Sequence, residues 1–146
     1  AFSGCAAISL ALIAALVWGN VQTANALYLK KDLERQATLS RMTELCLRLD
    51  QTEGYVPGET PVVFIGLPSF DTPEALGSVS QITGAWRNST VGGGYYAAYF
   101  SYILQTPIRI GSESEFPEGA QPDAMPPFPA EGGICRAGDM FIVRMG

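Results

Sequence analysis

Four carboxylate side chains in the last third of the chain are candidates for metal binding or acid–base catalysis. Such side chains can bind a calcium ion through their oxygens or act as a general acid and base. A calcium loop needs ligands at fixed intervals, whereas these four stand at irregular spacing among Gly, Ser and Pro. The pattern therefore predicts a solvated acidic loop. The four are Glu113, Glu115, Glu118 and Asp123.

Histidine is absent from the 146 residues. The sequence therefore lacks the commonest general base at neutral pH, and no Ser-His pair can activate a hydroxyl. The triple glycine Gly92–Gly94 has the composition of a phosphate-binding loop without its Lys or its spacing. Asn88-Ser89-Thr90 matches the short glycosylation pattern. No residue is predicted to be catalytic, to bind a cofactor or to hold a metal.

The charge balance bears on the class of partner. The formal net charge is −5 and no cluster of Lys and Arg is present. Binding to a phosphate backbone depends on such clusters. Nucleic acid is therefore not an expected partner.

The three cysteines stand far apart at Cys5, Cys46 and Cys135, with no metal-ligand spacing between them. We expect Cys46 and Cys135 to be small buried hydrophobic side chains. A disulfide between these two is the alternative if the domain lies outside the cytoplasm.

The secondary-structure elements of the chain begin with Ala1–Val21, a run of 21 residues without a charged side chain. A helix of about 20 apolar residues crosses a bilayer core about 30 Å thick, so residues 1–22 are predicted to be a transmembrane helix in contact with lipid. A cleaved signal peptide is the weaker interpretation, because the run has no basic segment before it and is too long. Because position 1 is not Met, we expect the sequence to be a fragment of a longer chain.

The transmembrane helix is predicted to continue without a break into an amphipathic helix over Thr23–Gln51, which contains neither Gly nor Pro. Its apolar residues change sides along the helix. Leu29, Leu33 and Ala37 share one face, whereas Leu39, Met42, Cys46 and Leu49 share nearly the opposite one. We therefore expect a helical neck over residues 23–37 and a core-packing face in the domain over residues 38–146.

The remaining pattern predicts a small α/β domain. Val62–Ile65 is an apolar, β-branched run typical of a central strand. Tyr95–Leu104 is predicted to be an aromatic helix, with a strand as the alternative. The predicted fold is therefore a long N-terminal helix followed by about three strands in a mixed sheet, packed by two helices. A short helix is also expected over Asp71–Ile82, and a hairpin is expected from Ile134–Arg136 and Met140–Met145, joined by a turn over Arg136–Asp139.

Three stretches resemble a known family. ANALYLKKDLERQATLSRMTELCLRLDQTEGYVPGETPVVFIG, MPPFPAEGGI and FIVRM are similar to the C-terminal end of GtrII-type glucosyltransferase proteins of bacteria. The resemblance implies a multi-pass membrane protein that uses a polyprenyl-phosphate glucose donor to glucosylate cell-surface polysaccharide. It also implies that the catalytic carboxylates lie nearer the family's N-terminus, so none is carried onto this sequence.

The resemblance thus implies a C-terminal accessory domain of a membrane glycosyltransferase, without its catalytic centre and with a cell-surface glycan or lipid-linked sugar as a partner. It places the domain on the extracytoplasmic side of the cell membrane. Lys30, Lys31 and Arg35 follow the apolar run and by themselves favour the cytoplasmic side. Because earlier spans can fix the orientation of a multi-pass protein, we expect the extracytoplasmic side.

Two alternatives come from the layout of the chain. In a pilin-type subunit, one long helix that is apolar first and amphipathic later leads into a small sheet domain. Phe2 agrees with that pattern, whereas Ala6 stands where pilins typically carry Glu. The other alternative is a single-pass, membrane-anchored interaction domain.

Overall fold

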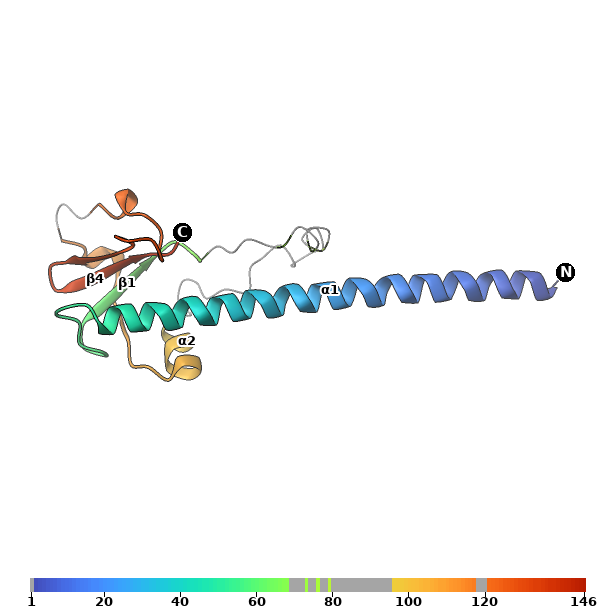
Figure 1. Cartoon of the computed structure of the whole chain (residues 1–146), viewed down its shortest axis with the longest axis horizontal. Helices are drawn as coiled ribbons and strands as arrows, with labels where there is room; N and C mark the ends of the chain where they lie inside the picture. Colours follow the sequence, from blue (N-terminus) through green and yellow to red (C-terminus); the bar gives the residue numbers. More distant parts are fainter. Residues whose placement is uncertain (1, 69–72, 74–75, 77–78, 80–95, 118–120) are drawn as a thin grey trace. The chain divides into compact units, whose positions relative to one another are not determined.

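The computed structural model describes residues 2–68, 73, 76, 79, 96–117 and 121–146 (Figure 1). Its contacts divide the chain into two compact units. The first comprises Ala1–Glu34 with Asp71–Asn88, and the second comprises Arg35–Phe70 with Ser89–Gly146. The predicted helix over Asp71–Ile82 lies outside the described residues, apart from Pro73 and the buried Leu76 and Val79. The motifs at Asn88–Thr90 and Gly92–Gly94 also lie outside them.

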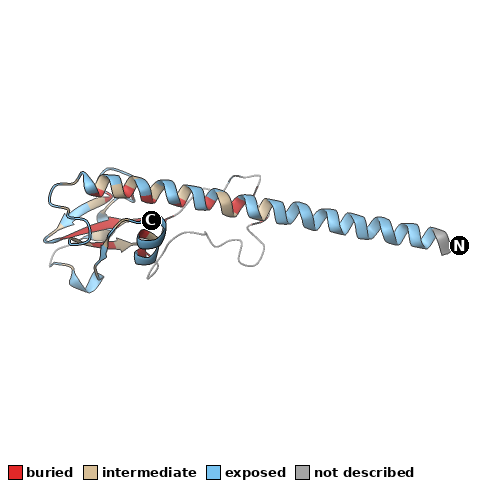
Figure 2. Ribbon diagram, turned by 90° about the horizontal axis from the view of Figure 1, so that it is seen from below, coloured by how far each residue is buried: buried red, intermediate tan, exposed pale blue. Residues whose placement is uncertain are grey.

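The first unit contains the apolar part of helix α1 (Phe2–Asp50). Residues 4–25 are all exposed, as the uninterrupted pale blue of Figure 2 shows. Among the described residues, α1 is the one helix long and apolar enough to cross a membrane, with a mean hydropathy of 1.9 in its most apolar window. The predicted long, apolar N-terminal helix is therefore confirmed.

A buried ion pair follows the apolar run within the same unit. Lys30 is 2% exposed and its Nζ donates a hydrogen bond to Oε1 of Glu34, which is also buried. Lys31 Nζ lies 3.2 Å from the second oxygen of Glu34. Charged groups are rarely buried unless they are paired in this way. Of the apolar residues predicted to share one side of the neck, Leu29 and Leu33 are exposed and Ala37 is half-buried.

In the second unit, one face of α1 forms part of the core. The buried positions are Thr38, Met42, Leu45 and Leu49, spaced by four, three and four residues as one helical face requires. Met42 and Leu49 confirm the prediction, and Cys46 packs at the edge of the core. The predicted burial of Leu39 is wrong, because that side chain is 38% exposed.

The sheet has four strands in the order β2-β1-β4-β3. The central strand β1 (Pro61–Ile65) pairs in parallel with β2 (Arg109–Ile110) and with β4 (Met140–Arg144). Strand β3 (Ile134–Ala137) pairs antiparallel with β4 through a two-residue turn in which Gly138 has φ +62°. The predicted central strand, mixed sheet and hairpin are confirmed. The turn of the hairpin is shorter than predicted, because Arg136 and Ala137 pair with β4 as part of β3. The short strand β2 is additional to them.

The predicted aromatic helix is confirmed, and its strand alternative is wrong. It consists of α2 (Tyr96–Tyr99) and a π-helical turn η3 (Phe100–Leu104). It ends at Gln105, whose φ is +52°, before Pro107. Tyr96 and Phe100 are buried against the sheet, and the rings of Tyr96 and Phe64 stack.

Both faces of the sheet are covered in the second unit. The core lies on the face that carries Val62, Phe141 and Val143, where α1, α2 and η3 pack. The opposite face carries Val63 and Ile142, and the segment formed by residues 111–117 and 121–125 lies over it (Figure 1). That segment contains two short 3₁₀ turns, η4 (Glu113–Glu115) and η5 (Pro122–Ala124).

Candidate functional site

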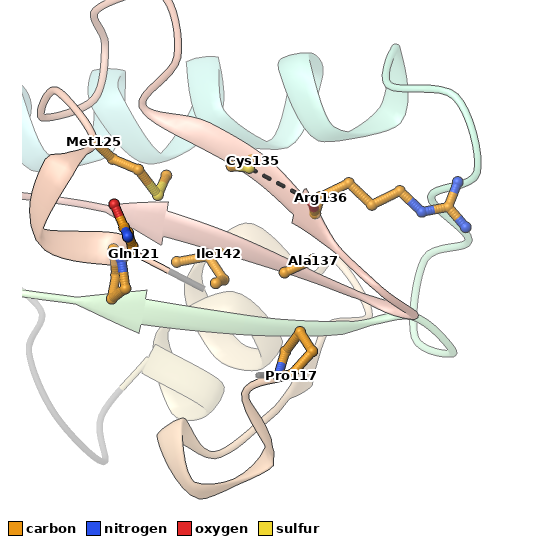
Figure 3. A pocket seen from close by; sticks show the side chains of 8 residues that line it. Pro117, Gln121, Met125, Cys135, Arg136, Ala137 and Ile142 are labelled. Atoms are coloured by element: carbon orange, nitrogen blue, oxygen red, sulfur yellow. Dashed lines mark hydrogen bonds between the residues drawn. The ribbon is translucent and has the colours of Figure 1, made fainter. Parts of the chain in front are cut away.

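A hollow of about 290 Å³ lies beside strand β3 on the sheet face turned away from α1 (Figure 3). Cys135 and Ala137 of β3 and Ile142 of β4 form its floor, as their register on adjacent strands requires. The other wall comes from the segment before the hairpin. It is formed by Pro117, Gln121, Pro122 and Met125, while Arg136 lies at the rim.

The wall of this first hollow is held by Arg144 at the end of β4. Its Nη1 donates hydrogen bonds to the carbonyl oxygens of Asp123 and Met125. A guanidinium presents several donors in a fixed fork and can therefore bind two carbonyls at once. Arg144 thus fixes η5 relative to the sheet and keeps the hollow open.

A second hollow, also of about 290 Å³, lies on the other face of the same strand, between Ile134 and the C-terminal end of α1. Arg48 organises it. Its guanidinium donates to Pro129 O at 2.7 Å and to Glu44 Oε1 at 2.6 Å, and it lies 5.2 Å from the centre of the Phe128 ring. The remaining lining residues are mostly polar or small: Gln51, Thr52, Ala130, Glu131 and Gly132.

A third hollow of about 390 Å³ lies near the opposite edge of the sheet, between Tyr96, Ile110 and Glu113. The Tyr96 hydroxyl donates to Gly66 O at 3.5 Å, and burial raises its pKa to about 12. A phenol with a raised pKa is neutral throughout the physiological range and is a poor nucleophile there.

The predicted acidic loop contains structured turns. Ser112 caps η4, and the Glu115 carboxylate accepts a hydrogen bond from the Ser112 N–H in a capping box. Asp123 lies in η5, whereas Glu118 lies outside the described residues. Within the described part of the chain, no three His, Cys, Asp or Glu side chains come together as a metal site would require.

The cysteines differ in environment. Cys46 is half-buried, and burial, followed by the charge of Asp50, raises the pKa of its thiol. The expected burial of Cys135 is wrong, because this side chain is exposed at the first hollow. All three thiols are free, so the alternative disulfide is not formed. The strand position of Cys135 was predictable, but the hollow beside it depends on a loop that is distant in sequence.

Comparison with protein-family models, curated proteins and solved structures finds no match. Within the described residues, a function can be proposed on the exposed apolar part of α1 and on the two hollows that flank β3. Together they define a class of small α/β domain attached to a long apolar helix.

Proposed function

We propose that this chain is a membrane-anchored, non-catalytic domain that serves a larger membrane assembly. The observation that supports this most directly is that the two ends of α1 have different environments. Its charge-free N-terminal residues are exposed in a manner that suits lipid, whereas Met42, Leu45 and Leu49 of the same helix build the core of the second unit. One element thus provides an anchor and a structural part of the domain.

In its specific form, the proposal is that the assembly is a GtrII-type membrane glucosyltransferase and that the chain is its C-terminal accessory domain. The three stretches that carry the resemblance support this, because they meet in one core. The first contributes Leu45 and Val62, the second Phe128, and the third Phe141 and Val143. A shared sequence pattern that coincides with a core is what a common domain would retain.

The glucosyltransferase role is tested in the complete gene that encodes this segment. Removal of residues 38–146 should abolish glucose incorporation into the surface polysaccharide, measured by mass spectrometry, while the remaining protein stays in the membrane. As a matched control, the exposed-site variant Leu47→Ala should retain full incorporation. Normal glucosylation by the truncated protein would contradict the proposal.

A pilin-like subunit is the second candidate, and the single continuous helix Phe2–Asp50 favours it. In that case, shearing of cells should release the chain in filaments, and cysteines introduced into the exposed apolar part of α1 should cross-link neighbouring copies into ladders. A chain that stays monomeric in the membrane fraction would contradict this candidate.

A further inference from the structure

The outer edge of β3 is the strongest candidate for an interaction surface. β3 is the last strand in the order β2-β1-β4-β3, and within the described residues it pairs on one side, with β4. Its middle residues, Cys135 and Arg136, are exposed. An edge of this kind presents unpaired backbone groups to any chain that can adopt an extended conformation.

The register identifies which backbone groups face outward. The Arg144 N–H donates to Gly133 O, and hydrogen-bonded pairs alternate along an antiparallel ladder. The pairs Cys135–Ile142 and Ala137–Met140 are therefore bonded across the ladder. The N–H and C=O groups of Ile134 and Arg136 consequently point away from β4. The Arg136 C=O accepts a long hydrogen bond of 3.5 Å from the Cys135 thiol and keeps a second lone pair for a peptide N–H.

The two hollows described above flank this edge on opposite faces of the sheet. The first adjoins Cys135 and Ala137, and the second adjoins Ile134. At about 290 Å³ each, they are at or below the small end of the range for small-molecule pockets, which is about 300–1,000 Å³. Their positions suit successive side chains of an added strand, because neighbouring residues of a strand point to opposite faces.

From this geometry we propose that β3 binds an extended peptide segment of a partner protein as a fifth strand of the sheet. Backbone groups of Ile134 and Arg136 would bond to the peptide, and the two hollows would select its side chains. The first hollow is lined mainly by Pro117, Met125 and Ile142 and takes an apolar side chain. The second is lined by Gln51, Thr52 and Glu131 and takes a polar one.

The volume of the first hollow also favours a partner peptide over a second copy of this chain as the strand that pairs with β3. If two β3 strands paired with each other, the side chains brought to the first hollow would be Cys135 and Ala137 of the other copy. Those side chains are too small to fill about 290 Å³. A different segment, with larger apolar residues at alternate positions, fits better. The proposal requires only the fold of the second unit, so it is independent of the glucosyltransferase role.

The test uses the full chain in lipid nanodiscs and two pools of fluorescent heptapeptides. In one pool, Leu, Val or Met alternates with Ser, Thr or Gln. The other pool has the same composition in shuffled order. We expect the alternating pool to bind at least tenfold more tightly by fluorescence anisotropy. Equal binding of the two pools would overturn the proposal.

Variants locate the binding to the β3 edge. Arg136→Pro removes an outward N–H that β4 does not use, and proline is tolerated on the solvent side of an edge strand. It should weaken binding about tenfold, the usual effect of losing a backbone hydrogen bond with its geometry. As a control, Leu47→Ala changes an exposed residue that lines neither hollow and should bind within about threefold of the unchanged chain.

A third variant covers the case in which Arg136→Pro fails to fold. Ala137→Leu fills the first hollow from β3 itself and should also weaken binding of the alternating pool about tenfold. Unchanged binding by a folded Ala137→Leu protein would overturn the proposal. Self-association of the chain that Arg136→Pro abolishes would overturn it in favour of a second copy as the occupant.

Discussion

Phe64 and Tyr96 stack with their ring centres 4.1 Å apart and their planes 12° from parallel. The contact joins the central strand β1 to helix α2, which lie 32 residues apart in the sequence, and it buries the Tyr96 ring while the hydroxyl reaches Gly66 O. Because this packing buries Tyr96, it also affects the pKa of the Tyr96 hydroxyl.

Tyr96 should make stability fall at high pH. Burial raises its pKa from 10.0 to about 12. A group with a raised folded-state pKa stabilises fully below its unfolded pKa, and this contribution is lost as the pH rises through the folded value. The free energy of unfolding should therefore decrease between pH 10 and 12. The decrease should be smaller in Tyr96→Phe, measured by urea unfolding in detergent. Identical pH profiles would contradict the assignment. Tyr55 and Tyr99, whose pKa values are also raised by burial, should leave a residual decrease.

The core-facing side of α1 can be tested with two leucines of the same helix. Leu45 is fully buried, whereas Leu47 is 57% exposed. Leu45→Ala should lower the free energy of unfolding by about 2–5 kcal/mol, because it removes buried methyl groups and leaves a cavity. Leu47→Ala should change it by less than about 0.5 kcal/mol. Denaturant unfolding monitored by tryptophan-independent far-UV circular dichroism measures both, and equal effects would show that the buried face is assigned incorrectly.

The sequence predicts the existence of helix α1 better than it predicts which face of α1 packs against the core. The absence of Gly and Pro from Thr23 to Gln51 correctly predicts a helix, and Met42 and Leu49 lie on its buried face. The observed face is rotated by roughly 50° from the predicted one. The rotation arises because Leu45 and Thr38 are buried whereas Leu39 is exposed. Thr38 is polar, so apolar spacing does not reveal its place in the core.

The strands differ in how well local sequence specifies them. β1 and the β3–β4 hairpin are predictable, because β-branched runs and Gly138 specify them locally. Strand β2 has two residues and forms through pairing of Arg109 and Ile110 with β1, so no local sequence pattern predicts it. The hollows beside β3 depend in the same way on long-range contacts, such as those from Arg144 to the η5 segment.

The cysteines should react with thiol reagents in a definite order. Cys135 is exposed, whereas Cys46 is half-buried and has a raised pKa, so less of it is present as the reactive thiolate. Because Cys5 is also exposed, the measurement uses a Cys5→Ser protein. A membrane-impermeant maleimide should label its Cys135 several-fold faster than its Cys46 at pH 7, and Cys135→Ser should remove the fast phase. Equal labelling rates would contradict the structure.

The same reagent tests the expected side of the membrane. In intact cells, Cys135 should be labelled without permeabilisation if the second unit is extracytoplasmic. Cys135→Ser and permeabilised cells provide the negative and positive controls. Labelling that appears only after permeabilisation would place the domain in the cytoplasm.

Two glycines with left-handed backbones should respond differently to alanine. Gly66 has φ +77°, and an added Cβ would lie 2.7 Å from Gly146 O, whereas at Gly138, with φ +62°, the nearest atom is 4.0 Å away. Both substitutions incur backbone strain of about 1 kcal/mol. Gly66→Ala should cost at least about 1 kcal/mol more, because backbone atoms must also move. Equal losses in urea unfolding would contradict the close approach of Gly66 and Gly146.

The position of β4 in the sheet has a consequence for biosynthesis. β4 is among the last residues of this sequence to be made, yet it lies between β1 and β3 and supplies the buried Phe141, Ile142 and Val143. The sheet cannot close until residue 144 has left the ribosome. At about 5–20 residues per second, the apolar helix emerges several seconds earlier. During that interval, β1 and the core face of α1 lack their partner strand, and they are then most dependent on chaperones.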